Sequence, residues 1–188
     1  MRVFLFMIFV VVVVAGVAAA FVWYGLFDVS ARVPHAAITL DLIEAVRDRS
    51  IVVHSRNVKV PSLDNPDLAA RGASLFHEEC RDCHGAPGVA AESFAQGLYP
   101  APADLLSGDV QKEWKDKQLF WIVENGLKMT GMPAFGSTLS RDELYNVVAF
   151  LRRLPGTTPE QYKLLIGGSA GGRAENRPAG TGPAVQTQ

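Results

Sequence analysis

Apolar residues are most concentrated at the start of the chain. Residues 3–27 contain no charged side chain and are mostly valine, phenylalanine and alanine. As a helix that rises about 1.5 Å per residue, this segment is longer than the hydrocarbon core of a bilayer, which is about 30 Å thick. Trp23 and Tyr24 lie where an interfacial aromatic belt is expected. The pattern predicts a transmembrane anchor over residues 1–27.

A cleaved signal peptide is the alternative, because the small residues that end near Ala20 resemble a cleavage site. The apolar region of a signal peptide is usually about 7–15 residues long, which is shorter than this segment and favours an uncleaved anchor. Arg2 precedes the segment and Asp28 follows it. By the positive-inside rule, the rest of the chain is predicted to face the periplasm from the bacterial inner membrane, which the chain crosses once.

Residues 28–66 combine one amphipathic pattern with a turn-rich stretch. Apolar residues such as Leu42 and Val46 recur there at helical spacing. The region is interpreted as a helical stalk or linker between the membrane and the next domain. His35 and His54 lie in it and are interpreted as exposed or packing residues rather than metal ligands.

Between residues 67 and 155, amphipathic patterns alternate with loops. The patterns predict helices over residues 66–80, 112–127 and 140–156. The last is the clearest, because Ser140 and Glu143 form a capping box at its start and Pro155 stops it. No strand pattern competes, so an all-α domain is predicted for 67–155.

The rest of the chain, residues 156–188, is interpreted as a C-terminal extension. From about residue 167 it is rich in glycine and has little to bury, so we expect disorder there. The 188 residues carry a formal net charge of −1 and are 48% hydrophobic. This composition suits one modest domain with additions at its ends and gives no reason to expect nucleic acid as a partner.

The chain has 2 cysteines, and both lie in the sequence CRDCH, as Cys80 and Cys83 followed by His84. A structural zinc site needs four ligands, and no second pair of ligands lies at the usual spacing. A thioredoxin-like redox pair would follow a strand in a βαβ unit, whereas this pair follows a predicted helix. A disulfide across two residues would leave His84 unexplained. C-x-x-C-H is typical of covalent c-type haem attachment, with two thioethers from the cysteines and His84 as an axial iron ligand.

An electron-transfer haem needs a sixth iron ligand, and methionine is one that raises the reduction potential. Downstream, the sequence LKMTGMPAFG forms a loop between two predicted helices. Most methionines fill cores, but Met132 between glycine and proline is a poor core position. Met132 is therefore predicted to be the second axial ligand, with Met129 as the competitor. His77 is expected to be exposed.

These features in order resemble the class I c-type cytochromes, in their membrane-anchored, monohaem bacterial form. The resemblance covers residues 67–155 and rests on ARGASLF, CRDCH, TGMPAF and LYNVVAFLRRL. It implies the class I cytochrome c fold, in which the first and last helices cross and the haem lies in a loop-lined crevice. Gly72, Phe76 and Phe150 match the residues of that crossing.

The resemblance also implies further haem contacts. In this family a proline carbonyl accepts the N–H of the histidine ligand, and Pro100 or Pro102 matches that position. Thr130 matches a hydroxyl that commonly bonds a haem propionate, and Trp121 could do the same. One covalently attached haem c is the implied cofactor.

The function that this implies is one-electron transfer, without bond-making catalysis. The predicted partners are a terminal oxidase, a reductase or a quinol-oxidising complex, and the chain would be either a tethered carrier or a fixed subunit. Acidic residues outnumber basic ones between residues 67 and 155, so a strongly basic docking rim is not expected. The alternative is a gas-binding or catalytic haem protein, which would require a labile sixth ligand.

Overall fold

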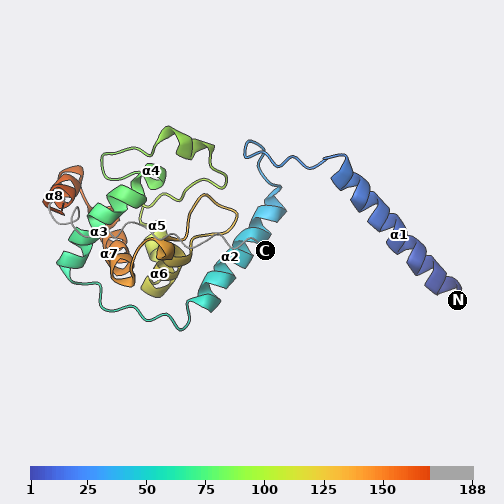
Figure 1. Cartoon of the computed structure of the whole chain (residues 1–188), viewed down its shortest axis with the longest axis horizontal. Helices are drawn as coiled ribbons and strands as arrows, with labels where there is room; N and C mark the ends of the chain where they lie inside the picture. Colours follow the sequence, from blue (N-terminus) through green and yellow to red (C-terminus); the bar gives the residue numbers. More distant parts are fainter. Residues whose placement is uncertain (170–188) are drawn as a thin grey trace. The chain divides into compact units, whose positions relative to one another are not determined.

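A computed structural model describes residues 1–169, and the disorder predicted from about residue 167 falls almost entirely outside them. Figure 1 shows a helical chain, and residues 1–169 contain no strand beyond one isolated bridge between Ala86 and Val89. The chain divides into two compact units, Met1–Pro34 and a second that begins at His35. The predicted all-α architecture is therefore confirmed for the described part of the chain.

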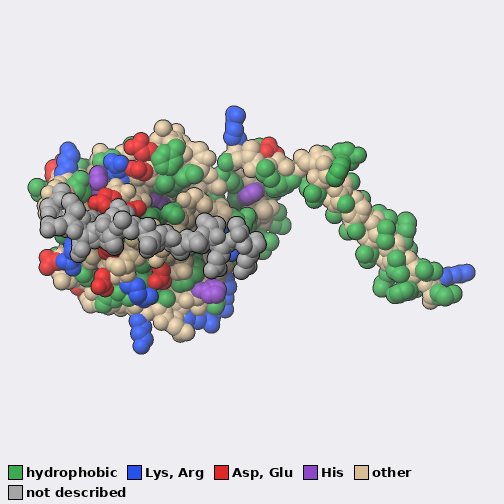
Figure 2. Space-filling view, in the orientation of Figure 1, with side chains coloured by type: hydrophobic (Ala, Val, Ile, Leu, Met, Phe, Trp, Pro, Cys, Tyr) green, Lys and Arg blue, Asp and Glu red, His purple; other side chains and the backbone are tan. Residues whose placement is uncertain are grey.

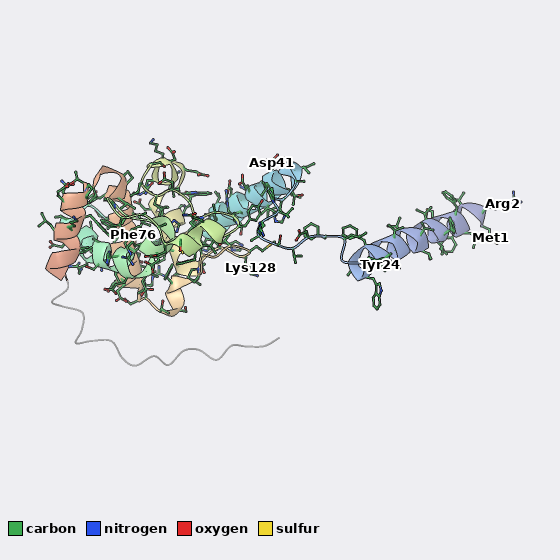
Figure 3. All side chains as sticks on the ribbon, turned by 90° about the horizontal axis from the view of Figure 1, so that it is seen from above. Met1, Arg2, Tyr24, Asp41, Phe76 and Lys128 are labelled. Carbon is green, nitrogen blue, oxygen red and sulfur yellow. The ribbon has the colours of Figure 1, made fainter. Side chains whose placement is uncertain are left out.

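The first unit contains a single helix, α1 (Arg2–Trp23). None of its residues is buried, although its mean hydropathy is 3.0. Hydrophobic side chains cover it in the space-filling view (Figure 2), and Arg2 and Tyr24 mark its two ends in Figure 3. By length and composition it is the one helix in residues 1–169 that is able to cross a membrane, a test that a signal sequence also passes.

The second unit is built on the crossing of α3 (Pro66–Glu79) and α7 (Arg141–Arg153). A β-carbon on Gly72 would lie 1.9 Å from the backbone oxygen of Asn146, so only glycine permits this approach. The rings of Phe76 and Phe150, both fully buried, pack with their centroids 5.4 Å apart. The predicted crossing of the first and last helices of this domain is thus confirmed.

Both helices begin as their sequences dictate. Asn65 caps α3 by accepting a hydrogen bond from the amide of Asp67 at 2.9 Å. At the start of α7, the Ser140 amide donates to the Glu143 carboxylate at 2.9 Å, and the Glu143 amide donates back to the Ser140 hydroxyl at 3.4 Å. This is the capping box that the sequence predicts.

The prediction of a single helix over 112–127 is wrong, because the structure contains two helices there. The segment forms α5 (Asp109–Glu113) and α6 (Asp116–Asn125), and Trp114 between them has an extended backbone. The guanidinium of Arg152 on α7 donates to the carbonyls of Gln111 and Trp114 and pairs with Asp116. These carbonyls therefore have partners that replace helical amides, which stabilises the break.

The helix predicted in 28–66 is α2 (Ala37–His54), and it does not stand apart from the domain as a stalk. α2 lies along one side of the helical domain (Figure 1) and contacts α6. Ile51 near its end is only 1% exposed. The segment that follows is tied to α7, since the Tyr145 hydroxyl donates to the carbonyl of Lys59 and Arg153 donates to that of Asp64.

A further helix, α8 (Pro159–Ser169), follows α7 and packs against α3. Its Tyr162 is 1% exposed, and its hydroxyl lies 2.9 Å from Nδ1 of His77. His77 is thus partly buried and hydrogen bonded, and not a simple surface residue as expected. The short elements that remain are α4 (Arg81–His84) and the 3₁₀ turns Ser93–Gly97, Phe135–Ser137 and Leu154–Gly156.

Candidate functional site

The functional residues predicted from sequence meet at a cavity of about 330 Å³ in the second unit. Its walls are mostly apolar and come from α2, α3, α4, α5, α6 and α7 together with two loops. The predicted site residues that line it are Cys80, Cys83, His84, Pro100, Pro102, Thr130 and Met132. An apolar pocket with a few polar groups is the usual form of a cofactor site.

The C-x-x-C-H sequence forms one tight turn directly after α3. Cys80 ends α3 and starts α4, and its carbonyl accepts hydrogen bonds from the amides of Cys83, at 3.2 Å, and His84, at 3.0 Å. Gly85 ends the turn with a φ of +68°, a conformation that glycine adopts readily. One helical turn therefore places both sulfur atoms and the imidazole on the cavity wall.

The tautomer of His84 is set by its hydrogen bond. Nδ1 lies 2.8 Å from the carbonyl oxygen of Ala103, and because a carbonyl only accepts, Nδ1 carries the proton. Burial lowers the pKa of His84, while the bond to Ala103 opposes that change. The imidazole is therefore neutral near pH 7, and its Nε2 lone pair is available to a metal.

The carbonyl that orients His84 corrects the sequence prediction. It belongs to Ala103, and not to Pro100 or Pro102. Both prolines line the same cavity through the loop that carries Ala103. Sequence similarity placed this loop correctly, but the residue whose carbonyl points to the imidazole depends on the path of the loop.

Cys80 and Cys83 form no disulfide in the structure and are free cysteines. Burial, with smaller contributions from Glu79 and Cys83, raises the pKa of the Cys80 thiol to about 12. Near pH 7 Cys80 is thus a thiol, whereas the thiolate is the metal ligand and the nucleophile. Among residues 1–169, no group of three or more His, Cys, Asp or Glu side chains is arranged to hold a metal ion.

Met132 reaches the cavity on a loop that is shaped by backbone contacts. The Thr130 hydroxyl donates to the carbonyl of Leu127 at 2.7 Å and accepts from the amide of Met132 at 3.1 Å. A β-carbon on Gly126 would meet the backbone of Met132 and Pro133 at 2.6–2.7 Å. Thr130 therefore holds the Met132 loop, and its proton is already donated within the protein.

The structure separates Met132 from its competitor. Met132 is partly buried, packs against the core and lines the cavity. Met129 has a φ of +61°, is 78% exposed and is not part of the cavity wall. Of the two methionines in the loop, only Met132 is in a position to contact a group bound in the cavity.

The structure does not place Trp121 at the cavity. Its ring stacks on that of His54, with centroids 5.9 Å apart, so the predicted contact between Trp121 and the cofactor is not supported. Trp114, between α5 and α6, lines the cavity and also packs against the core. The break between α5 and α6 turns Trp114 toward this wall, and no sequence pattern signals that break.

The helix crossing and the C-x-x-C-H turn at an apolar cavity are the features of the c-type cytochrome class. Residues 67–151 match the family model described as "Cytochrome C oxidase, cbb3-type, subunit III". The match supports a c-type cytochrome domain over these residues, and a domain of that kind implies haem c binding and electron transfer. It includes neither α2 nor α8. No curated protein and no solved structure matches the chain.

Proposed function

We propose that the chain is a membrane-tethered, one-electron carrier that holds a single haem c in the cavity. The observation that carries this proposal is the meeting of Cys80, Cys83, His84 and Met132 at one apolar pocket. Haem c, when bound, supplies an iron couple that accepts and returns one electron. The protein acts by holding that group and tuning its potential, and it makes no covalent bond in a substrate.

Each residue has a defined part in this proposal. Cys80 and Cys83 would hold the porphyrin as thioethers, and His84 would offer Nε2 to the iron because Ala103 fixes its other nitrogen. Met132 would offer its sulfur from the loop that follows α6, which lines the same cavity. Thioether sulfur as the second ligand favours the reduced iron and raises the potential. The apolar walls exclude water, which further disfavours the more highly charged oxidised state.

The proposed setting is the periplasmic face of the bacterial inner membrane, with α1 as an uncleaved anchor. The length and hydropathy of α1 support this placement. The family name supports a partner in a respiratory complex, such as a terminal oxidase. A tether raises the effective concentration of the domain near membrane partners, whether it moves as a carrier or is held as a subunit.

Met132→Ala should remove the sixth iron ligand. We expect the oxidised protein to lose the long-wavelength absorption band that reports a sulfur–iron bond, and the reduced protein to bind carbon monoxide rapidly. The unaltered protein should keep the band and bind carbon monoxide slowly. Absorption spectroscopy and stopped-flow mixing measure both effects.

Met129→Ala is the matched control, because Met129 is exposed and does not line the cavity. It should leave the band and the slow carbon monoxide reaction unchanged. Loss of the band in Met129→Ala instead would show that the ligand assignment is wrong. Rapid carbon monoxide binding by the unaltered protein would count against the carrier function itself.

The orientation of the domain is tested by protease treatment of intact spheroplasts of a bacterium that expresses the full chain. If the second unit faces the periplasm, added protease should digest it without lysis, while a cytoplasmic control protein remains intact. A periplasm-facing marker protein should be digested in the same sample. Protection of the domain until lysis would contradict the proposed orientation.

A further inference from the structure

Helix α2 contributes one of its faces to the wall of the cavity, although it lies outside the residues that match the cytochrome family. Glu44, Arg47 and Ile51 recur at intervals of three and four residues, so they lie on one side of the helix. All three line the cavity together with the cysteines, His84 and Met132. The haem site therefore has a wall that the family pattern does not include.

Contacts at both ends hold α2 in this place. Just before the helix, the His35 amide donates to the Tyr99 hydroxyl at 2.9 Å, and the two rings meet edge to face with centroids 5.2 Å apart. At the other end, His54 stacks on Trp121 of α6. Tyr99 precedes the loop that orients His84, so α2 spans from that loop to α6.

Acidic side chains outnumber basic ones on the cavity wall. Its acidic side chains are Glu44, Glu79 and Glu113, and Arg47 is the only lysine or arginine among the lining residues of the described chain. The Nε atom of Arg47 donates to Asp48 at 2.7 Å, and the side chain is 38% exposed. Within residues 1–169, the two terminal nitrogens of Arg47 make no hydrogen bond, so they are available to a group in the cavity.

The other side chains considered for the haem carboxylates are less suitable. The Thr130 hydroxyl already donates to the carbonyl of Leu127, and Trp121 is not on the cavity wall. A haem carries two propionates, and each requires a donor or a cation when it is partly buried. Arg47 offers terminal N–H groups in the fork geometry that matches a carboxylate.

We propose that α2 is part of the haem-binding site and that Arg47 binds a haem propionate. This inference rests on the proposed function, because it assumes that the cavity holds haem c. It assigns a role to a segment that precedes the cytochrome domain, and it makes Arg47 a determinant of the reduction potential. Glu44 and Ile51 flank Arg47 on the same face, and Ile51 anchors that face in the core.

The effect of Arg47 on the iron follows from its charge. A nearby cation disfavours the oxidised iron, which carries one more positive charge than the reduced iron. It also favours the ionised propionate, so it lowers the pKa of that carboxyl. For a partly exposed charge, we expect a change of about threefold in the one-electron equilibrium, which corresponds to about 28 mV.

The test compares Arg47→Gln, Arg47→Lys and Arg49→Gln in the full-length, haem-loaded protein in detergent. Arg49 is an exposed arginine on the same helix that does not line the cavity, so Arg49→Gln removes the same net charge elsewhere. The reduction potential is measured against pH by spectroelectrochemical titration. Arg47→Gln should lower the reduction potential by about 28 mV, which is a threefold change in the one-electron equilibrium constant. The potential falls as the propionate ionises, and the pH of that fall should move upward in this variant.

Arg47→Lys retains the charge, so its reduction potential should change by less than half as much as that of Arg47→Gln. Arg49→Gln should leave the curve of potential against pH unchanged. Equal curves for Arg47→Gln and Arg49→Gln, or an unchanged potential in Arg47→Gln, would overturn the inference. Haem content and the absorption spectrum of the unaltered protein report separately on the proposed function. If the unaltered protein carries no covalent haem, the proposed function is contradicted. If it carries haem normally but Arg47→Gln leaves the potential unchanged, only the proposed role of α2 is contradicted.

Discussion

A chain in which Cys80 and Cys83 are both replaced by serine should carry no covalently attached haem. The sequence contains only these 2 cysteines, and serine oxygen does not form the thioether. Both sulfur atoms lie on the cavity wall within one helical turn. We therefore expect complete loss of haem from the denatured protein, measured by the intact mass and by haem staining after denaturing electrophoresis.

The two single variants are the matched controls for this result. Cys80→Ser and Cys83→Ser each keep one sulfur atom, so each should retain some haem through one thioether. Covalent haem in the double variant would mean that another side chain makes the attachment, and the proposed site would then be wrong. Haem that is present but released on denaturation would show that the pocket binds haem without the expected bonds.

Gly72→Ala should be among the most destabilising single substitutions in the chain. The new β-carbon would lie 1.9 Å from the backbone oxygen of Asn146 and 3.0 Å from the β-carbon of Phe150. Backbone atoms of two packed helices have to move apart to admit it, and overpacking of this kind costs about 3 kcal/mol. For a domain of this size, the expected fall in Tm is about 10 °C or more.

Gly97→Ala is the control, because a β-carbon at Gly97 would have no neighbour within 4 Å. Its effect on the free energy of unfolding should stay within about 0.5 kcal/mol. Thermal unfolding followed by circular dichroism compares the two variants with the unaltered protein under the same detergent conditions. Equal Tm values for Gly72→Ala and Gly97→Ala would show that α3 and α7 do not cross as described.

Helix α2 has a different place in the molecule from the one that its position in the sequence suggests. A helix between a membrane segment and a folded domain is easily taken for a linker. Here its buried Ile51 and the stacking of His54 on Trp121 fix it to the domain. If Arg47 binds a propionate, the region next to the anchor also influences the potential of the iron.

The features that the sequence determined are those with local physical causes. The capping box of α7 follows from side chains within three residues of the amides that they satisfy. The C-x-x-C-H turn is equally local, so both cysteines and His84 were found from their spacing. Gly72 was found differently, from the resemblance to class I c-type cytochromes, and the structure supplies the reason, because a β-carbon there would meet the backbone of Asn146.

The features that only the tertiary structure decided depend on groups far apart in the chain. Arg152 divides the expected helix by donating to backbone carbonyls 38 and 41 residues away, and Ala103 orients His84 across 19 residues. Tyr162 is buried only because α8 returns to α3. The sequence pattern does not reveal such contacts, because a backbone carbonyl accepts a hydrogen bond whatever side chain its residue carries. The sequence alone determined which chemical groups the site contains, and the fold decided which carbonyls and which helix surround them.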